Sequence, residues 1–323
     1  MSNSNQLEMM ERIALDLEGV ERALASSFNT GSEDFNTLIR PLSEAGGKRL
    51  RAQLCLLIAN AGTSVEAERI TIAEAVEMLH LATLIHDDVL DQAEIRRGEE
   101  TIHKHKGNKV AILSGDYLFA KAFRIVSEMP HMEYLKVFSH IITCLVEGEF
   151  MQMEDVYRID QGIDRYMTKT QKKTADFMEG CMELGGLLGG WSSDEIMYLK
   201  RYGHALGMAF QITDDIMDYR ETSDTTGKPV GNDLREGLLT YPLLSIVNES
   251  NQKQLLQDIK NLNYGGNEQE IIDYVIAQGG IDNTLLVAQQ YCDDALSALQ
   301  SIRDFDGKEF LVLAVQNLAD RKV

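Results

Sequence analysis

Apolar residues recur every three or four positions along most of this chain, which is the spacing expected of helices that bury one face. The pattern is clearest over residues 68–91, 134–156 and 197–219. These stretches carry few charges, which indicates helices that are buried nearly all round. No run of alternating apolar and polar residues with hairpin turns stands out. The pattern therefore predicts an all-α fold.

The predicted helices form one uninterrupted series of ten or more. No segment rich in proline, glycine or serine divides the 323 residues, and no low-complexity tract occurs. Because this length suits one large domain, we expect a single domain over residues 1–323. Loops are expected at residues 44–53, 95–108 and 223–238, where charged residues and glycine interrupt the helical spacing. Long polar loops of this kind often carry functional residues.

The formal net charge of −20 argues against a nucleic-acid partner, since binding to nucleic-acid phosphates needs a basic surface. The negative charge also argues against binding to anionic lipid through a polybasic segment. No apolar run reaches the roughly 18 residues needed to span a bilayer, and the polar, acidic N-terminus is unlike a signal peptide. A small anionic substrate remains open, because local charge decides its binding.

The cysteines lie far apart in apolar helical surroundings, without any CxxC pair. This arrangement is typical of buried free thiols. We therefore expect a reducing, cytoplasmic location. The four positions are Cys55, Cys144, Cys181 and Cys292.

Three aspartates gather at the C-terminal end of the helix predicted for residues 68–91. Asp87 and Asp91 lie four positions apart and so share one face, and Asp88 lies beside them. Their charges repel one another, and an anion is unfavourable at a helix C-terminus. A solvated acidic helix end is one interpretation, and a site completed by a cation is the other.

The same arrangement recurs near the end of the helix predicted for residues 197–219, with Asp214, Asp215 and Asp218 at the same offsets. Two such clusters are hard to explain as solvated surface. Carboxylates without thiolates or imidazoles favour a hard cation, and Mg²⁺ commonly binds one or two carboxylates together with substrate phosphates. The pair of clusters therefore predicts a Mg²⁺-dependent diphosphate site.

Basic residues concentrate at four places in this acidic chain. Arginine forks and lysine point charges suit the oxygens of a diphosphate. Each group alone is more typical of a solvated face, but their coincidence with two aspartate clusters favours a diphosphate site. The groups are Lys48, Arg49 and Arg51; Arg96 and Arg97; Lys169, Lys172 and Lys173; and Lys228 in a glycine-containing loop.

Ordered blocks of sequence between residues 40 and 245 make the chain similar to the trans-isoprenyl diphosphate synthases, also called polyprenyl synthases, of the medium- or long-chain type. The blocks are GGKRLR (46–51), HLATLIHDDVLDQAEIRRG (80–98), SGDYLFAKAF (114–123), EGEFMQ (147–152), KTADF (173–177), GMAFQITDDIMDY (207–219) and GKPVGNDLREGLLTYPLL (227–244). The resemblance implies the isoprenoid synthase fold, a bundle of long antiparallel helices around a deep central cavity, usually in a homodimer. It implies elongation of an allylic diphosphate with isopentenyl diphosphate by ionisation, condensation and elimination.

The resemblance also implies roles for the matching residues. About three Mg²⁺ ions on the allylic diphosphate would be held by Asp87, Asp88, Asp91, Asp214, Asp215 and Asp218. The allylic diphosphate would contact Arg96, Lys173, Thr174, Gln211 and Lys228. Isopentenyl diphosphate would be held by Lys48, Arg51, His80 and Arg97. The catalytic set would be Asp87, Asp88, Asp91, Arg96, Lys173, Asp214, Asp215 and Lys228.

In this family the side chains before the first aspartate cluster line the pocket for the growing product. The matching residues here are Met78, Leu79, Ala82 and Thr83. Ala82 and Thr83 are not aromatic, so we expect an all-trans product longer than C15. Many relatives carry a lysine where Leu238 stands, so one phosphate contact is expected to be missing. A catalytic subunit that needs a small partner is therefore the alternative to a self-sufficient enzyme.

Other classes fit the sequence less well. A terpene cyclase uses one DDxxD motif and a differently spaced second metal motif, so the second DDxxD and the GGKRLR block speak against it. A head-to-head condensing enzyme is disfavoured for the same reason. A non-catalytic subunit or acidic scaffold has no use for clustered, repelling carboxylates. At most transient membrane contact is expected, when a long product leaves.

Overall fold

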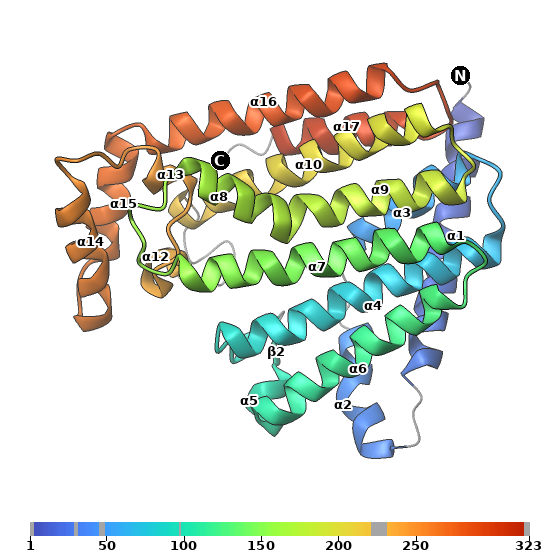
Figure 1. Cartoon of the computed structure of the whole chain (residues 1–323), viewed down its shortest axis with the longest axis horizontal. Helices are drawn as coiled ribbons and strands as arrows, with labels where there is room; N and C mark the ends of the chain where they lie inside the picture. The colour runs from blue at the N-terminus through green and yellow to red at the C-terminus, as the bar shows by residue number, and fades with distance from the viewer. Residues whose placement is uncertain (1–2, 29–31, 45–48, 97, 221–230, 320–323) are drawn as a thin grey trace. The chain divides into compact units, whose positions relative to one another are not determined.

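The computed structural model describes residues 3–28, 32–44, 49–96, 98–220 and 231–319. Figure 1 labels their helices and strands. They fall into two compact units. Unit 1 comprises Met1–His140, Gly180–Met197 and Asp304–Gly307, and unit 2 comprises Ile141–Glu179, Tyr198–Arg303 and Lys308–Val323. Three helices contribute residues to both units, namely α7 (Met132–Glu154), α9 (Asp176–Leu188) and α10 (Ser193–Arg220). This division does not test whether residues 1–323 form the single domain with a central cavity that was expected, and both remain predictions.

Helix α4 is the centre of unit 1 and packs against α1, α3 and α6. Its apolar residues are buried on several faces, and Ile72, Val76 and Leu79 have no exposed surface. This agrees with the sequence, in which the helix carries few charges before its acidic end. Besides parts of the shared helices, the elements of unit 1 are α1 (Asn3–Ser27), α2 (Glu33–Glu44), α3 (Leu50–Asn60), α4 itself (Glu66–Leu90), β1 (Ile95–Arg96), β2 (Glu99–Glu100), α5 (Ile102–Lys106) and α6 (Asn108–Ser127).

The acidic end of α4 is held closely against α6. A Cβ atom at Gly115 of α6 would lie 2.1 Å from Nε2 of His86, so only glycine allows this approach. The same His86 nitrogen lies 3.1 Å from the carbonyl oxygen of Ile112. These contacts fix the last turn of α4, from which the first aspartate cluster projects.

The segment after α4 is more ordered than the sequence indicated. A loop over residues 95–108 was expected, but β1 and β2 form an antiparallel pair in which Arg96 lies opposite Glu99. Helix α5 follows, and the side chain of Thr101 caps it by accepting the N–H of Lys104. The loop prediction is therefore wrong here, although two strands of two residues leave the fold all-α.

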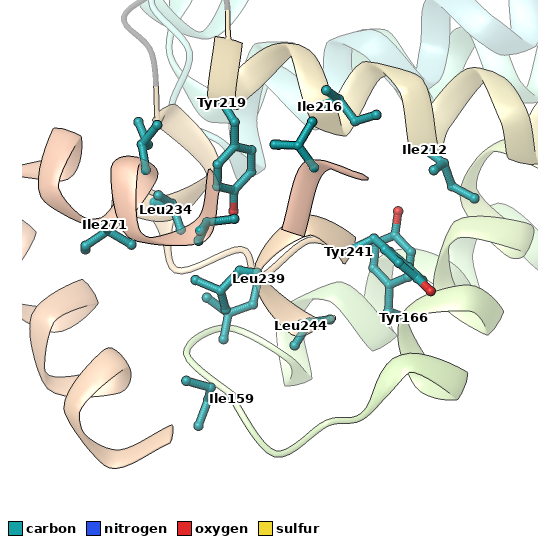
Figure 2. Close-up of a cluster of buried hydrophobic side chains, with 14 of the residues drawn as sticks. Ile159, Tyr166, Ile212, Ile216, Tyr219, Leu234, Leu239, Tyr241, Leu244 and Ile271 are labelled. Carbon is teal, nitrogen blue, oxygen red and sulfur yellow. The ribbon is translucent and has the colours of Figure 1, made fainter. Parts of the chain in front are cut away.

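Unit 2 is built around the second half of α10 and the C-terminal helices. The apolar face of α10 carries Ile212, Ile216 and Tyr219 into a buried cluster (Figure 2). Tyr166 and Tyr241 meet in that cluster with ring centroids 5.6 Å apart. The other elements are α8 (Ile163–Thr170), the π-helix η1 (Gln171–Ala175), α12 (Asn232–Glu236), α13 (Tyr241–Leu244), α14 (Gln252–Asn261), η2 (Leu262–Tyr264), α15 (Glu268–Ala277), α16 (Gly280–Gln300) and α17 (Lys308–Ala319).

The cysteines and the apolar runs agree with the sequence analysis. All four cysteines are buried thiols outside any disulfide, as predicted. Burial raises the pKa of the Cys55 thiol to about 12, which makes it a poor nucleophile near neutral pH. Among the described residues, no helix combines the length and hydropathy that a membrane crossing needs.

Candidate active site

The first aspartate cluster lies at the end of α4 in unit 1. Asp88 is 5% exposed, whereas Asp91 is exposed and forms the C-cap of the helix. The Nε atom of Arg96 donates to Oδ1 of Asp88 at 2.6 Å. Because β1 turns back after α4, Arg96 reaches a carboxylate eight positions earlier in the chain. This cluster is therefore balanced by a cationic side chain of its own unit.

In the second cluster, at the end of α10 in unit 2, Asp215 and Asp218 accept hydrogen bonds from uncharged donors among the described residues. Asp215 is 5% exposed, and its carboxylate accepts from the hydroxyl of Tyr166 at 2.5 Å and from the amide of Gln211 at 3.0 Å. Asp218 accepts the backbone N–H groups of Asn232 and Asp233, at 3.1 and 3.2 Å. These N–H groups belong to the first turn of α12, where an anion is favoured.

Burial dominates the electrostatics of the second cluster. It raises the pKa of Asp215 to about 7, against the opposing hydrogen bonds from Tyr166 and Gln211. Burial also raises the pKa of Asp218. The pKa of Asp233 lies well above its usual range because of burial and the neighbouring Asp218 and Asp215. Oxygen donors gathered at such a cost suit a hard divalent cation, which would stabilise their charged form.

The predicted contacts of the allylic diphosphate are partly brought together in unit 2. Thr174 donates to Oε1 of Gln211 at 2.9 Å, and Gln211 in turn donates to Asp215. Lys173 is ion-paired to Glu149 at 2.5 Å. Gly148 lies against Lys173, since a Cβ there would be 2.7 Å from its Cγ. Lys228 lies outside the described residues.

A π-helical turn presents these groups. Residues Gln171–Ala175 form it between α8 and α9, and it carries Lys172, Lys173 and Thr174. Such turns are rare and occur frequently at functional sites. A π-helix holds one more residue per turn than an α-helix would, and the sequence does not mark it, because residues 168–174 are all polar and show no apolar spacing.

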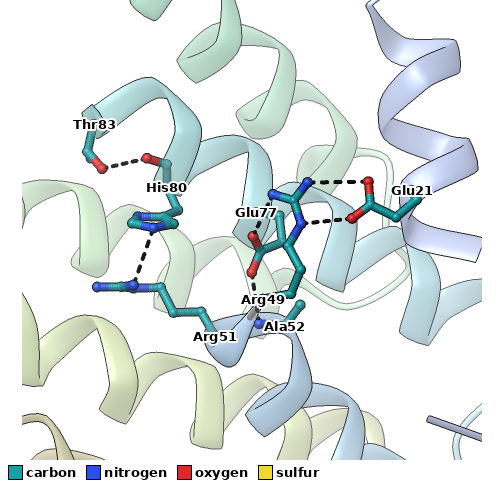
Figure 3. A network of polar contacts seen from close by, with 7 residues as sticks. All are labelled: Glu21, Arg49, Arg51, Ala52, Glu77, His80 and Thr83. Carbon is teal, nitrogen blue, oxygen red and sulfur yellow. Dashed lines mark hydrogen bonds and ion pairs between the residues drawn. The ribbon is translucent and has the colours of Figure 1, made fainter. Parts of the chain in front are cut away.

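The predicted isopentenyl diphosphate contacts that the structure describes lie together in unit 1. Nη1 of Arg51 on α3 lies 3.4 Å from Nε2 of His80 on α4 (Figure 3). Burial lowers the pKa of Arg51, against the neighbouring charges of Glu77 and Asp87. An arginine nevertheless keeps its charge at neutral pH. The other two predicted contacts, Lys48 and Arg97, lie outside the described residues.

The predicted product-pocket residues lie on α4 before the first cluster. Met78, Leu79 and Ala82 have no exposed surface. Thr83 is half-buried, and its hydroxyl donates to the carbonyl oxygen of His80 at 2.8 Å. Leu238 is half-buried in unit 2, where its N–H donates to the carbonyl oxygen of Asp233 at 2.8 Å. The roles assigned to these residues stay predictions.

Several residues of these sites were missed from the sequence. Tyr166 touches the second cluster from a helix that is far away in the sequence. Asp233 touches it from a stretch that was expected to be a polar loop. No local pattern marks either residue. Glu77 is 1% exposed and lies one turn before His80 on α4. A glutamate inside an otherwise apolar helix is a readable signal, because a buried carboxylate needs a partner.

One further group of possible cation ligands is explained by ion pairing. Donor atoms of Asp176, Glu179 and His204 lie within 4.8 Å of one another in unit 2. Glu179 is paired with Lys200 at 3.5 Å, and His204 lies 3.6 Å from it. The Lys200 ammonium thus supplies the positive charge that a cation would bring.

Comparison with known proteins gives the class of the chain. The Polyprenyl synthetase family profile matches residues 32–278, more than half of the chain. The octaprenyl diphosphate synthase of Escherichia coli K12 is 33% identical over 312 residues, which cover 95% of this chain and 96% of that protein. The nonaprenyl diphosphate synthase of Mycobacterium tuberculosis H37Rv is 33% identical over 306 residues, covering 94% and 91%. The chain belongs to the polyprenyl synthetase family.

Solved structures agree. The polyprenyl synthase from Caulobacter crescentus CB15, complexed with calcium and isoprenyl diphosphate, is similar with a TM-score of 0.87 and 30% identity, covering 100% of this chain and 98% of that one. The heptaprenyl diphosphate synthase from Staphylococcus aureus has a TM-score of 0.88 at 28% identity, covering 96% and 99%. The predicted family, the all-α isoprenoid synthase fold class and the trans-prenyltransferase class of enzyme are confirmed.

Proposed function

We propose that the chain condenses isopentenyl diphosphate with an allylic diphosphate, in a Mg²⁺-dependent reaction, to an all-trans polyprenyl diphosphate longer than C15. The observation that carries the proposal is the group of carboxylates at the end of α10, where burial raises the pKa of Asp215 to about 7. A cation is the natural complement of that group. Relatives named octaprenyl and nonaprenyl diphosphate synthase support a long product.

The proposed allylic site uses the two aspartate clusters as Mg²⁺ ligands. Mg²⁺ held by these carboxylates would supply the positive charge that a departing diphosphate needs. Asp215 is oriented for this task by the Tyr166 hydroxyl and the Gln211 amide, and Thr174 orients Gln211. The remaining proposed ligands are Asp87, Asp88, Asp91, Asp214 and Asp218, with Arg96, Lys173 and Lys228 on the diphosphate.

The proposed isopentenyl site uses Arg51 and His80, with Lys48 and Arg97. Arg51 is a half-buried cation, and its reduced contact with water strengthens its attraction for a diphosphate. His80 lies within 3.4 Å of it and supplies a second polar group, whose ring nitrogens donate or accept according to the tautomer. The chemistry then needs no dedicated protein base, since the released diphosphate accepts the final proton. Holding the two substrates together supplies much of the rate acceleration.

Product length is proposed to depend on Met78, Leu79, Ala82 and Thr83. Replacing Ala82 by phenylalanine fills space on the buried face of α4 and is expected to shorten the product. The measurement is chromatography of the reaction products by length. Ala73→Phe, at another fully buried alanine of α4, is the matched control and is expected to leave the length unchanged. An unchanged length in Ala82→Phe, with turnover retained, would contradict this assignment.

The state of assembly is also proposed. Helix α6 exposes Ile112, Leu113 and Phe123, with exposed fractions of 44, 57 and 41%. Exposed apolar residues of this size are typical of a surface that binds another protein, and we propose a homodimer. The alternative of a required small subunit is not favoured, although one relative is the heptaprenyl diphosphate synthase component 2 of Geobacillus stearothermophilus. The buried free thiols suit a cytoplasmic location.

The test is made on the purified chain alone. It is incubated with Mg²⁺, labelled isopentenyl diphosphate and farnesyl diphosphate, and the products are separated by length. A ladder that ends at one size is expected, and a chelator should abolish it. No incorporation with farnesyl, geranyl or geranylgeranyl diphosphate would contradict the proposal of a self-sufficient synthase. Leu238→Lys would then show whether the missing lysine is the reason.

A further inference from the structure

Arg49 begins α3 in a conformation that arginine rarely adopts. It is the N-cap of the helix with φ 45° and ψ 38°, in the left-handed region. A non-glycine residue is strained in that region and needs compensation from its surroundings. Its own side chain does not cap the helix. The compensation comes instead from two other helices of unit 1.

Two carboxylates hold the Arg49 guanidinium (Figure 3). Glu21 of α1 accepts from Nε at 2.8 Å and from Nη2 at 3.3 Å, and Glu77 of α4 accepts from Nη1 at 3.2 Å. The Arg49 side chain is only 7% exposed. Burial alone would lower the pKa of Arg49, but Glu21 and Glu77 raise it above its usual value. The charge of Arg49 is therefore satisfied within the protein.

Glu77 also caps α3. Its second oxygen accepts the backbone N–H of Ala52 at 3.1 Å, in the first turn of the helix. Glu77 thus binds both the side chain of Arg49, which precedes the first turn of α3, and the backbone N–H of Ala52 within that turn. A carboxylate at a helix N-terminus is favourable, and the hydrogen bond satisfies a donor that the helix leaves open.

The same turn carries the predicted isopentenyl diphosphate contacts. Arg51 lies between Arg49 and Ala52 in the chain, and His80 lies one turn after Glu77 on α4. Glu77 therefore ties the helix of Arg51 to the helix of His80, close to where their side chains meet at 3.4 Å. Arg49 differs from Arg51, because it already faces two carboxylates and is poorly suited to bind an anionic substrate.

We propose that Arg49, Glu77 and Glu21 act as a positioning clamp, which holds Arg51 and His80 in register for the diphosphate of isopentenyl diphosphate. The inference rests on the proposed function, because that function supplies the substrate. Arg49 and Glu77 touch no reacting atom in this proposal. Their effect is to fix the left-handed turn before α3 and thereby the direction of Arg51.

The decisive variant is Glu77→Gln. The amide keeps an oxygen for the Ala52 N–H but removes the negative charge that pairs with Arg49. The KM for isopentenyl diphosphate is expected to rise about tenfold, whereas the KM for the allylic diphosphate stays within about twofold. Titration calorimetry with isopentenyl diphosphate alone measures the same loss without turnover. Glu21→Gln, whose side chain is 43% exposed, is expected to give a smaller rise in the same KM.

The matched control lies at the other end of α3. Asp16 of α1 accepts from Arg69 at 2.9 Å and from Asn60 at 2.7 Å, and its side chain is 5% exposed. Asp16→Asn therefore breaks a similarly buried ion pair that joins α1, α3 and α4. It is expected to lower thermal stability as much as Glu77→Gln does, with both KM values unchanged.

The outcomes separate the clamp from the proposed function. An inactive wild-type chain that also fails to bind isopentenyl diphosphate would refute the proposed function itself. An active wild type in which Glu77→Gln changes both KM values equally, or neither, would refute the clamp. The same holds if Asp16→Asn reproduces the selective rise. If Glu77→Gln does not fold, Arg49→Lys, which keeps the charge without the fork, is measured in its place and is expected to raise the same KM.

Discussion

Asp88 near the end of α4 and Asp215 near the end of α10 occupy the same position in their DDxxD motifs, yet they bind different partners. Asp88 is paired with the cation of Arg96. Among the residues that the structure describes, Asp215 accepts hydrogen bonds from the uncharged side chains of Tyr166 and Gln211, and burial raises its pKa to about 7 against the weaker effect of the nearby Lys169 charge. Within each unit, then, the same motif is compensated in a different way.

This difference shows where a cation matters more. A carboxylate paired with arginine is stable without metal, because the opposite charge is already present. A buried carboxylate with neutral donors and with Asp218 and Asp233 nearby is costly in its charged form. We therefore expect the second cluster to gain more stability from bound Mg²⁺ than the first.

The largest expected effect is a loss of activity, and it is expected to be equally large for both clusters. Asp88→Asn and Asp215→Asn are each expected to lower kcat about 10³-fold, since each removes a charged ligand that neutralises the departing diphosphate. Incorporation of labelled isopentenyl diphosphate measures the loss. A variant that retained a tenth or more of the wild-type rate would remove its cluster from the proposed catalytic set.

A smaller effect tests the neutral partner of Asp215. Tyr166→Phe removes a hydrogen bond to a buried carboxylate and is expected to lower the free energy of unfolding by about 2 kcal/mol. Tyr202→Phe is the matched control, because Tyr202 is equally buried but donates to the neutral carbonyl of Leu311 at 3.0 Å. It is expected to cost about 1 kcal/mol. Urea unfolding measures both, and equal losses would argue that Asp215 carries no special cost.

The smallest expected effect is that Asp215→Asn and Asp88→Asn change the free energy of unfolding in opposite directions in Mg²⁺-free buffer. Asp215→Asn relieves a buried charge and is expected to raise the free energy of unfolding by about 1 kcal/mol. Asp88→Asn deprives Arg96 of its partner and is expected to lower it by less than about 1 kcal/mol, because Arg96 is 34% exposed. Unfolding curves in the presence of a chelator give both values. A shift in the same direction for both would contradict the contrast drawn between the clusters.

The long helices could be predicted because burial on several faces leaves a strong apolar spacing in the sequence. Helices α4, α7 and α10 cover the three stretches in which that spacing is clearest. The hairpin of β1 and β2 could not be predicted, since strands of two residues show no alternation. Thr101 is a readable cap of α5, but the surrounding charges led to the expectation of a loop.

The candidate site was predictable where chemistry repeats locally and not where tertiary contacts create it. Each aspartate cluster is visible in the sequence as a spacing within its own helix. Arg51 and His80, 29 positions apart, were paired through the family resemblance, and the structure places them together. Tyr166 is 49 positions from Asp215, so only folding brings its hydroxyl to that carboxylate. The contacts of Arg49 with Glu21 and Glu77 were also hidden, because the resemblance assigns Lys48 and Arg51 of the same motif to the substrate and gives Arg49 no role.

The π-helical turn at Gln171–Ala175 makes this part of the chain unusually sensitive to deletion. Loss of one residue there would let α8 and α9 join as a continuous α-helix. It would also turn every side chain on one side of the deletion by about 100° relative to the other. Thr174 could then no longer face Gln211 while Tyr166 kept its place at Asp215. The extra residue thus sets the rotation of α9 about its axis relative to α8. A homologue that lacked it would need a different side chain to contact the residue at the position of Gln211.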